Sequence, residues 1–385
     1  MAKQSPLSLD AAKNLLEPDL YQLCQRLGKM SEVDAKKLAP IMLEALKLPN
    51  PYLAHRAMED LLQARPEWVD LPVWKEGKTV LMEAAKTGNL DLVDILVAQG
   101  ANVRKKSKKG ESALTLALKY DANHRFQEAV VDAILDAAKF TASDKSFALA
   151  LAANEGNLGG VRSLLKHKAN FTEELYASYS EEVEATNHGN ALQVACFKPE
   201  DDGQGKDIVT ALLENPASKA VIDYGWDNDD YGAPLNNAAF NNNTHAIALL
   251  LKNGAQVNPP DYIDGENPKT PLMSAAEGMH IEAMRLLLNA GAKANLVDDL
   301  GQNALHYLAS GESYMTEEEE LEYNLPCFHA LLKAGADPGL VNDDGETPAD
   351  LARQAERNVL ASHLEQIALG NQVSAPQSNK TGPRL

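Results

Sequence analysis

The chain has 385 residues and carries 55 acidic against 36 basic side chains, giving a formal net charge of −19 at pH 7. This excess of negative charge argues against a general nucleic-acid binder, which needs a basic surface, and favours a protein partner with a basic or amphipathic surface. Only three cysteines occur, at Cys24, Cys196 and Cys327, which predicts a protein without disulfides, metals or cofactors. The sequence has no signal-like start and no apolar run of membrane-spanning length, so we expect a soluble cytoplasmic protein.

Residues 1–72 are predicted to form helices that differ from those of the repeats in the rest of the chain. Leucines recur at helical spacing over residues 15–27, and a second apolar run covers residues 38–46 before Pro49. A third run contains Met58 and Leu62. Its distance from Gly77 predicts the outer helix of a degenerate capping repeat, which a stacked array needs because its end would otherwise expose an apolar face.

After residue 72 a short sequence motif, called the phrase below, recurs along the chain. It reads Thr270-Pro-Leu-Met-Ser-Ala-Ala276 in one copy and Ala233-Pro-Leu-Asn-Asn-Ala-Ala239 in another. Successive copies are 33, 35, 43, 43, 37, 33 and 44 residues apart. A repeat of this length predicts a stacked helical array, whose units bury their apolar faces only against each other. One apolar residue marks the position of each copy and is called its anchor; in the copy that begins at Thr270 it is Leu272. The anchors are Leu81, Leu114, Leu149, Leu192, Leu235, Leu272, Leu305 and Ala349.

The second half of most units ends in a pair of apolar residues followed by Gly-Ala, as at Leu287-Leu288 before Gly291-Ala292. Glycine there supplies the left-handed conformation that ends a helix. Together the two half-motifs resemble the ankyrin repeat, over residues 73–369 in about eight units. The resemblance implies an all-α solenoid. Each of its units consists of two helices joined by a loop and then an extended segment, the finger, that leads to the next unit. Stacking should be least regular over residues 141–231, where Lys168 replaces the capping glycine.

Three insertions separate the paired helices, at residues 119–127, 197–206 and 310–325. In the last of them Thr316 and Glu319 predict a capping box for a short extra helix. A final helix is predicted over residues 353–369. Residues 370–385 are polar and without periodicity, so we expect a disordered tail.

Aromatic and acidic residues gather in two fingers that should lie side by side in the resembled fold. Aromatic side chains give rigid contact area, and carboxylates select a basic partner. Asn237 and Phe240 would join them from the inner-helix surface. Alternatively, Trp226 folds back and covers an irregular part of the stack. The predicted finger residues are Tyr224, Trp226, Asp227, Asp229, Asp230, Tyr231, Tyr262 and Asp264.

The first finger has the opposite charge, with five cations in six residues. Such a cluster can bind nuclear-import machinery, anionic lipid or nucleic acid, but a simple solvated hairpin tip is the more common explanation. The cluster consists of Arg104, Lys105, Lys106, Lys108 and Lys109.

No catalytic motif stands out. Cys196, His188 and Asp207 fall within one unit and invite a nucleophile–base reading, but Cys196 occupies a position where the repeat needs a small packed side chain. The resemblance implies that His306 makes a hydrogen bond between repeats. It also implies that Asn258 and Asn295 shape the fingers, at a position that asparaginyl hydroxylases modify in some ankyrin proteins.

We therefore expect a non-enzymatic, monomeric scaffold or adaptor that binds a protein through its fingers and its concave inner-helix surface. The alternative is a bacterial effector acting in the host cytosol, in which residues 1–72 carry an unrecognised activity and the array selects the target. Nuclear entry is compatible with either function.

Overall fold

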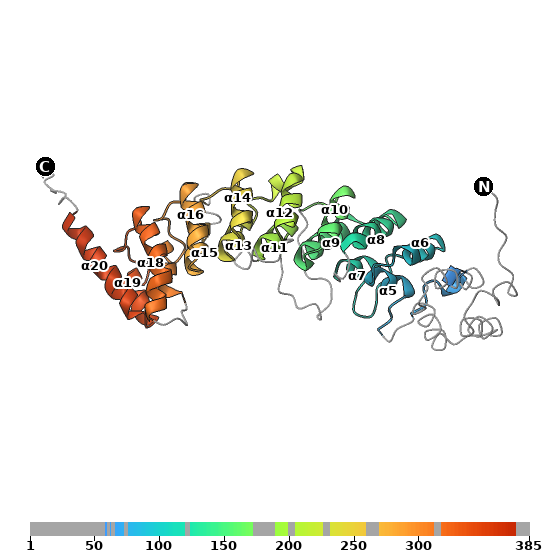
Figure 1. The fold of residues 1–385 in the computed structure, drawn as a ribbon, viewed down its shortest axis with the longest axis horizontal. Coiled ribbons are helices and arrows are strands. Elements are labelled where there is room, and N and C mark those ends of the chain that lie inside the picture. The colour runs from blue at the N-terminus through green and yellow to red at the C-terminus, as the bar shows by residue number, and fades with distance from the viewer. Residues whose placement is uncertain are drawn as a thin grey trace, which may run out of the picture. The chain divides into compact units, whose positions relative to one another are not determined.

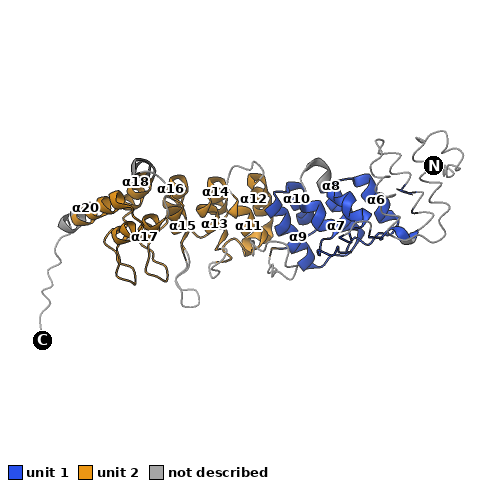
Figure 2. Ribbon diagram, turned by 90° about the horizontal axis from the view of Figure 1, so that it is seen from below, with its two compact units in different colours: residues 1–170, 176–186 blue, residues 171–175, 187–385 orange. Residues whose placement is uncertain are grey.

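A computed structural model describes residues 58–59, 62, 66–72, 76–119, 124–171, 189–198, 205–225, 232–258, 269–311 and 317–374. The chain divides into two compact units, the first covering residues 1–170 and 176–186 and the second residues 171–175 and 187–385 (Figure 2). Within the described residues the secondary structure is helical, apart from an isolated antiparallel bridge between Pro72 and Thr79. The prediction for residues 1–57 lies outside the described part.

From residue 66 on, the described residues of unit 1 form a 3-10 turn followed by three helix pairs. In each pair an inner helix is followed by an outer helix, and each inner helix packs against the next inner helix (Figure 1). The elements are η1 (Pro66–Trp68), α5 (Val80–Lys86), α6 (Leu90–Ala98), α7 (Ala113–Lys119), α8 (His124–Ala137), α9 (Ala142–Glu155) and α10 (Leu158–Lys166).

Unit 2 repeats this arrangement with five helix pairs. Its inner helices all have seven residues, and the finger loops project on the side of that inner row (Figure 2). The elements are α11 (Ala191–Phe197), α12 (Gly205–Glu214), η3 (Pro216–Ala220), α13 (Pro234–Phe240), α14 (Thr244–Lys252), α15 (Pro271–Glu277), α16 (Ile281–Asn289), α17 (Ala304–Ser310), α18 (Glu317–Lys333), α19 (Pro348–Gln354) and α20 (Asn358–Ser374).

The recurring phrase begins the inner helices other than α9, in which it lies in the middle of the helix. Its first residue is the N-cap: the Thr270 hydroxyl accepts a hydrogen bond from the Met273 amide, and the Asn303 side chain accepts from Leu305 and His306. Proline follows the cap in α13, α15 and α19, where its missing N–H costs nothing. All eight predicted anchors are buried, each no more than 5% exposed, which confirms the register read from the sequence.

Side chains in the turn between the two helices of a repeat reach back to the preceding repeat, that is, to the preceding helix pair. The Asn157 amide donates to the carbonyls of Ala117 and Leu118, and the Asn243 amide donates to that of Lys198. His280 donates through Nε2 to the Phe240 carbonyl at 2.9 Å. In every case the acceptor lies at the C-terminus of an inner helix, where carbonyls have no partner within the helix.

Arg357 fills the same turn position in the last unit. Its guanidinium donates to the carbonyls of Leu308 and Ala309 at 2.6 and 3.1 Å, and to that of Gly311. The residue is only 4% exposed. A buried cation that several helix-end carbonyls surround is stabilised by their dipoles.

A second series of bonds runs forward from the fourth residue of the phrase. Gln193, Asn236 and His306 donate to the carbonyls of Gly232, Lys269 and Glu346, each of which directly precedes the next N-cap. The structure thus confirms the inter-repeat hydrogen bond predicted for His306.

A third series links the fingers. The Asn258 side chain accepts from the Lys293 amide and donates to the Gly291 carbonyl, and Asn295 does the same with Asp337 and Gly335. These bonds are the finger-shaping role expected for the two asparagines. Asp70 Oδ1 accepts from the backbone amide of Asn102 at the corresponding place before α5.

Two helix predictions need correction. The acidic segment after residue 316 does not form a separate short helix: α18 runs without a break from Glu317 to Lys333, through Pro326. The last helix begins at Asn358 and ends at Ser374, not over residues 353–369, because α19 first ends in a left-handed turn at Glu356. Residues 375–385 lie outside the described part.

Lys168 has a positive φ of 60°, and it stands where Gly100, Gly254, Gly291 and Gly335 end the other outer helices. At those four glycines an added Cβ would meet no atom within 4 Å, so only backbone strain favours glycine. We expect Lys168→Gly to stabilise unit 1 by roughly 1 kcal/mol and to raise its Tm by about 2 °C. Lys168→Ala is the control, because it removes the side chain but keeps the strain. Equal effects of both substitutions, in thermal unfolding followed by circular dichroism, would contradict this account.

Burial lowers the pKa of His306 below its ordinary value of 6.5. The unfolded chain therefore binds a proton that the folded chain excludes, so the stability of unit 2 is complete above about pH 6.5 and falls as the pH drops towards the lowered value. Gln193 makes the equivalent bonds, from Nε2 to Gly232 and from the Asn190 amide to Oε1. We expect His306→Gln to retain the stability near pH 7.5 and to lose on the order of 1 kcal/mol less at about pH 5. Urea unfolding at the two pH values measures this; identical pH dependence in both proteins would exclude His306 as the titrating group.

Candidate functional site

The inner-helix surface of unit 2 presents aromatic rings around one lysine. Lys269, which precedes the N-cap of α15, places its ammonium 4.5 Å from the ring centre of Tyr307 and 5.9 Å from that of Phe240. It also forms an ion pair with Glu277 at the end of the same helix. Phe240 remains 42% exposed. An ammonium over two aromatic faces is worth about 0.5–1 kcal/mol per ring at an exposed site, so Lys269 connects three successive inner helices.

Tyr307 is fixed from its other end. Its hydroxyl donates to Asp298 Oδ2 at 2.6 Å, while Asp298 Oδ1 accepts from the Leu300 and Gln302 amides of the finger. Burial, together with the neighbouring carboxylates, raises the pKa of Tyr307, so the phenol stays protonated as a donor. The ring is therefore a rigid, uncharged element of this surface.

The predicted aromatic and acidic fingers are described only in part. Tyr224 is 48% exposed at the start of its finger. Asn237 is buried and donates to the Gln193 carbonyl at 3.2 Å, so its amide holds α13 against α11 and does not face solvent. Trp226, Asp227, Asp229, Asp230, Tyr231, Tyr262 and Asp264 lie outside the described residues.

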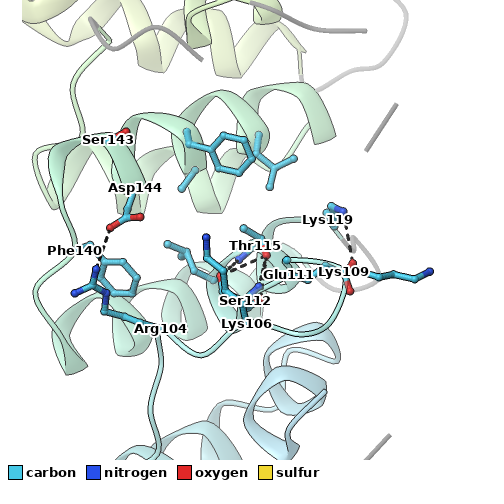
Figure 3. Close-up of a pocket in the computed structure, with 15 residues that line it drawn as sticks. Arg104, Lys106, Lys109, Glu111, Ser112, Thr115, Lys119, Phe140, Ser143 and Asp144 are labelled. Atoms are coloured by element: carbon cyan, nitrogen blue, oxygen red, sulfur yellow. Dashed lines mark hydrogen bonds and ion pairs between the residues drawn. The ribbon is translucent and has the colours of Figure 1, made fainter. Parts of the chain in front are cut away.

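The cationic finger is tied to its own unit. Arg104 faces Asp144 at 3.7 Å (Figure 3). Lys105 donates to the Asp70 carbonyl at 2.6 Å, and Lys109 pairs with Glu76 at 3.2 Å. Exposed pairs of this kind contribute at most about 1 kcal/mol each. The cluster is thus more than a solvated hairpin tip, since its side chains help to hold the finger in place. Lys106 and Lys108 complete the cluster and are both exposed.

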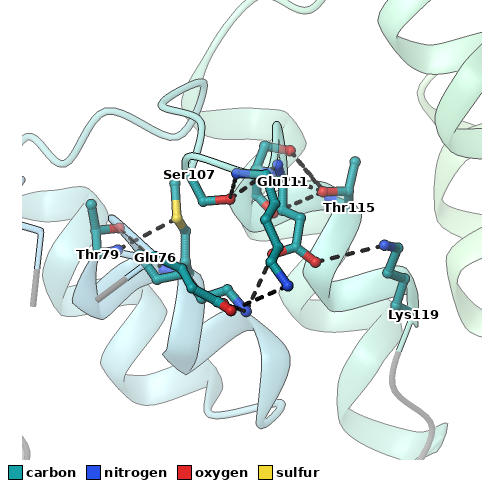
Figure 4. A network of polar contacts seen from close by, with 10 residues as sticks. Glu76, Thr79, Ser107, Glu111, Thr115 and Lys119 are labelled. Carbon is teal, nitrogen blue, oxygen red and sulfur yellow. Dashed lines mark hydrogen bonds and ion pairs between the residues drawn. The ribbon is translucent and has the colours of Figure 1, made fainter. Parts of the chain in front are cut away.

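Beneath this finger lies a network of alternating charges (Figure 4). Lys78 stands 3.2 Å from both Glu76 and Glu111, and Lys119 approaches Glu111 at 3.6 Å. Although burial opposes it, hydrogen bonds to Glu76 and Glu111 raise the pKa of Lys78. Hydrogen bonds from Lys78 and Lys109 lower the pKa of Glu76. These ion pairs link the residue before the N-cap of α5 to the finger and to α7.

No catalytic arrangement accompanies these surfaces in the described residues. Cys196 is fully buried in α11, and burial raises the pKa of its thiol, which disfavours the thiolate needed for nucleophilic attack. Burial likewise raises the pKa of Cys327 to about 11. His188 lies outside the described part. Among described residues, no group of His, Cys, Asp or Glu side chains is placed to hold a metal, and no helix is long and apolar enough to cross a membrane.

Lys269 and Tyr307 were not among the residues predicted from the sequence, although their positions relative to the anchors indicate that they are exposed on the inner helices. When the units are aligned on their anchors, Lys269 is three residues before its anchor, Tyr307 two residues after its own, and Phe240 and Glu277 both five after. These are the columns that the inner helices expose beside their buried anchors. Comparing these columns between neighbouring units would have brought the four residues together.

Comparison with known proteins agrees with this architecture. A family model of ankyrin repeats, with three copies, matches residues 52–144 and 235–317. Among solved structures the chain is similar to the human ASB11 ankyrin repeat domain, at 23% identity and a TM-score of 0.48, over 67% of this chain and 98% of that one. No curated protein gives a significant match.

The matched residues contain copies of the capped phrase and of the glycine turns, and some of the hydrogen bonds between repeats, such as those of Asn236, Asn258 and His280. The family model thus shows that residues 52–144 and 235–317 of this chain are ankyrin repeats.

Proposed function

We propose that this protein is a non-enzymatic adaptor that binds a partner protein through the fingers and inner-helix surface of unit 2. Ankyrin repeats generally mediate protein–protein interaction. The observation that supports this particular surface is the group of Phe240, Lys269 and Tyr307, in which aromatic rings from different inner helices stay partly exposed and are held by one cation.

Such a surface suits tight binding for two reasons. Aromatic side chains offer large contact area with few rotatable bonds, so little entropy is lost when a partner settles on them. The lysine is already fixed by Glu277 and the two rings, so it need not be ordered on binding. The acidic finger residues and the overall charge of −19 favour a partner that is basic or amphipathic.

The remaining parts of the proposal follow from this function. We propose a monomer acting in the cytoplasm, with residues 1–72 as a helical cap and, because α20 ends at Ser374, residues 375–385 as the disordered tail predicted from residue 370. The alternative, a bacterial effector active in a host cytosol through residues 1–72, makes a different prediction: the isolated segment 1–72 would then retain an activity that the array lacks.

Replacing the exposed rings tests the surface. We expect Tyr224→Ala combined with Phe240→Ala to weaken capture of the partner from cytosol about tenfold or more, because buried aromatic anchors contribute about 2 kcal/mol or more to an interface. Quantitative mass spectrometry after affinity capture measures the loss. Trp226→Ala with Tyr262→Ala forms a second arm that tests the fingers separately.

The matched control is Leu369→Ala, which removes an apolar side chain that is 62% exposed on α20, more than Tyr224 or Phe240. Surface substitutions of this kind change stability by about 0.5 kcal/mol or less, so all variants should unfold at nearly the same temperature. Capture that stays unchanged in both aromatic variants, with stability retained, would refute the proposed surface.

A further inference from the structure

A groove in unit 1 lies between the finger at residues 103–112 and helix α9 (Figure 3). Its volume is about 180 Å³. An apolar cavity of roughly 150 Å³ accepts one benzene ring, so the groove has room for a single large side chain of a ligand.

The groove exists because α9 departs from the register of the other inner helices. Helix α9 has 14 residues, whereas α5 and α7 have seven. Its anchor Leu149 follows the N-cap Thr141 by eight residues, while Leu81 follows the N-cap Thr79 by only two. The extra turns at the start of α9 carry Ser143 and Phe147, which form the wall opposite the finger.

The floor and one wall of the groove are apolar. Leu114 from α7 and Ala148 from α9 are buried beneath it, and Phe140 and Phe147 are half-buried along its side. Partly exposed phenylalanine rings next to an open volume favour an aromatic or leucine side chain as their partner, because such a contact buries the remaining apolar surface.

The rim is cationic. Four cations line the groove against only two carboxylates, in a chain whose net charge is −19. Figure 3 shows Arg104 beside Asp144 at one end and Lys109 with Lys119 towards the other. The ion pair of Arg104 with Asp144 is 3.7 Å long and its guanidinium is exposed, so the pair is weak enough for a ligand's carboxylates to compete with it, whereas the 3.6 Å pair of Lys119 with Glu111 is partly buried.

We propose that this groove binds an acidic peptide segment of a partner protein, with an aromatic or leucine residue in the apolar centre and Asp or Glu on both sides. The cations stand at separate places around apolar rings, whereas a phosphate group would need donors that converge on one point. This site differs from the proposed surface of unit 2 in its position and in the charge of its partner.

Selection of random displayed peptides on the full chain tests the inference. The enriched peptides should carry Phe, Tyr, Trp or Leu flanked by acidic residues. Labelled copies should bind in fluorescence anisotropy, with an affinity that falls as salt increases. Arg104→Ser combined with Lys109→Ser should weaken binding roughly tenfold, and Ser143→Trp should abolish it by filling the groove.

The control is Lys139→Ser with Arg162→Ser, which removes the same charge from exposed positions of unit 1 outside the groove. It should leave peptide binding unchanged. Tyr224→Ala with Phe240→Ala should do so as well, which separates this test from that of the proposed function. Circular dichroism confirms that each variant folds.

Three results would overturn the inference. One is enrichment of basic or uncharged peptides. Another is peptide binding that Ser143→Trp leaves intact. The third is preferential binding of phosphatidylserine vesicles or single-stranded DNA, lost in the Arg104→Ser, Lys109→Ser variant, because the cations would then serve a lipid or a nucleic acid and not a peptide.

Discussion

The structure depends on one constraint: short inner helices cannot satisfy their own C-terminal carbonyls. Seven residues make fewer than two turns, far below the length at which an isolated helix is stable in water. Side chains from the following unit provide the missing donors, as Asn243, His280 and Arg357 show. Each unit is thus completed by its neighbour, in its hydrogen bonds as well as in its apolar core.

This division of roles leaves the exposed columns of the inner helices open to variation. Anchors, caps and turn residues carry the stability, so neighbouring positions can hold Phe240, Lys269 or Tyr307 without weakening the stack. The same position of the phrase accepts Gln193, Asn236 or His306, since each has a donor that reaches the next unit. Only His306 adds a dependence on pH, because its ring can be protonated.

The two units differ in how they present charge. In unit 1 an early start of α9 and a lysine-rich finger create a cationic rim around apolar rings, inside a strongly acidic chain. In unit 2 a single lysine is enclosed by rings and a carboxylate. The two proposed binding surfaces therefore differ in charge, although they are built on the same kind of repeat.

The amino-acid sequence by itself determined which face of each unit is buried, because the anchors recur with the phrase and a helix of known register can bury only one side. It also located the glycine turns that end most of the outer helices, and the resemblance to the ankyrin repeat implied the hydrogen bond of His306. Tertiary structure alone decided where α9 begins, which carboxylates pair with the cationic finger, and that Lys269 lies over two rings. These features depend on contacts between residues far apart in the chain, such as Lys269 with Phe240 and Tyr307. Spacing along a sequence specifies the register within a repeat, but it does not specify which exposed side chains of different repeats meet.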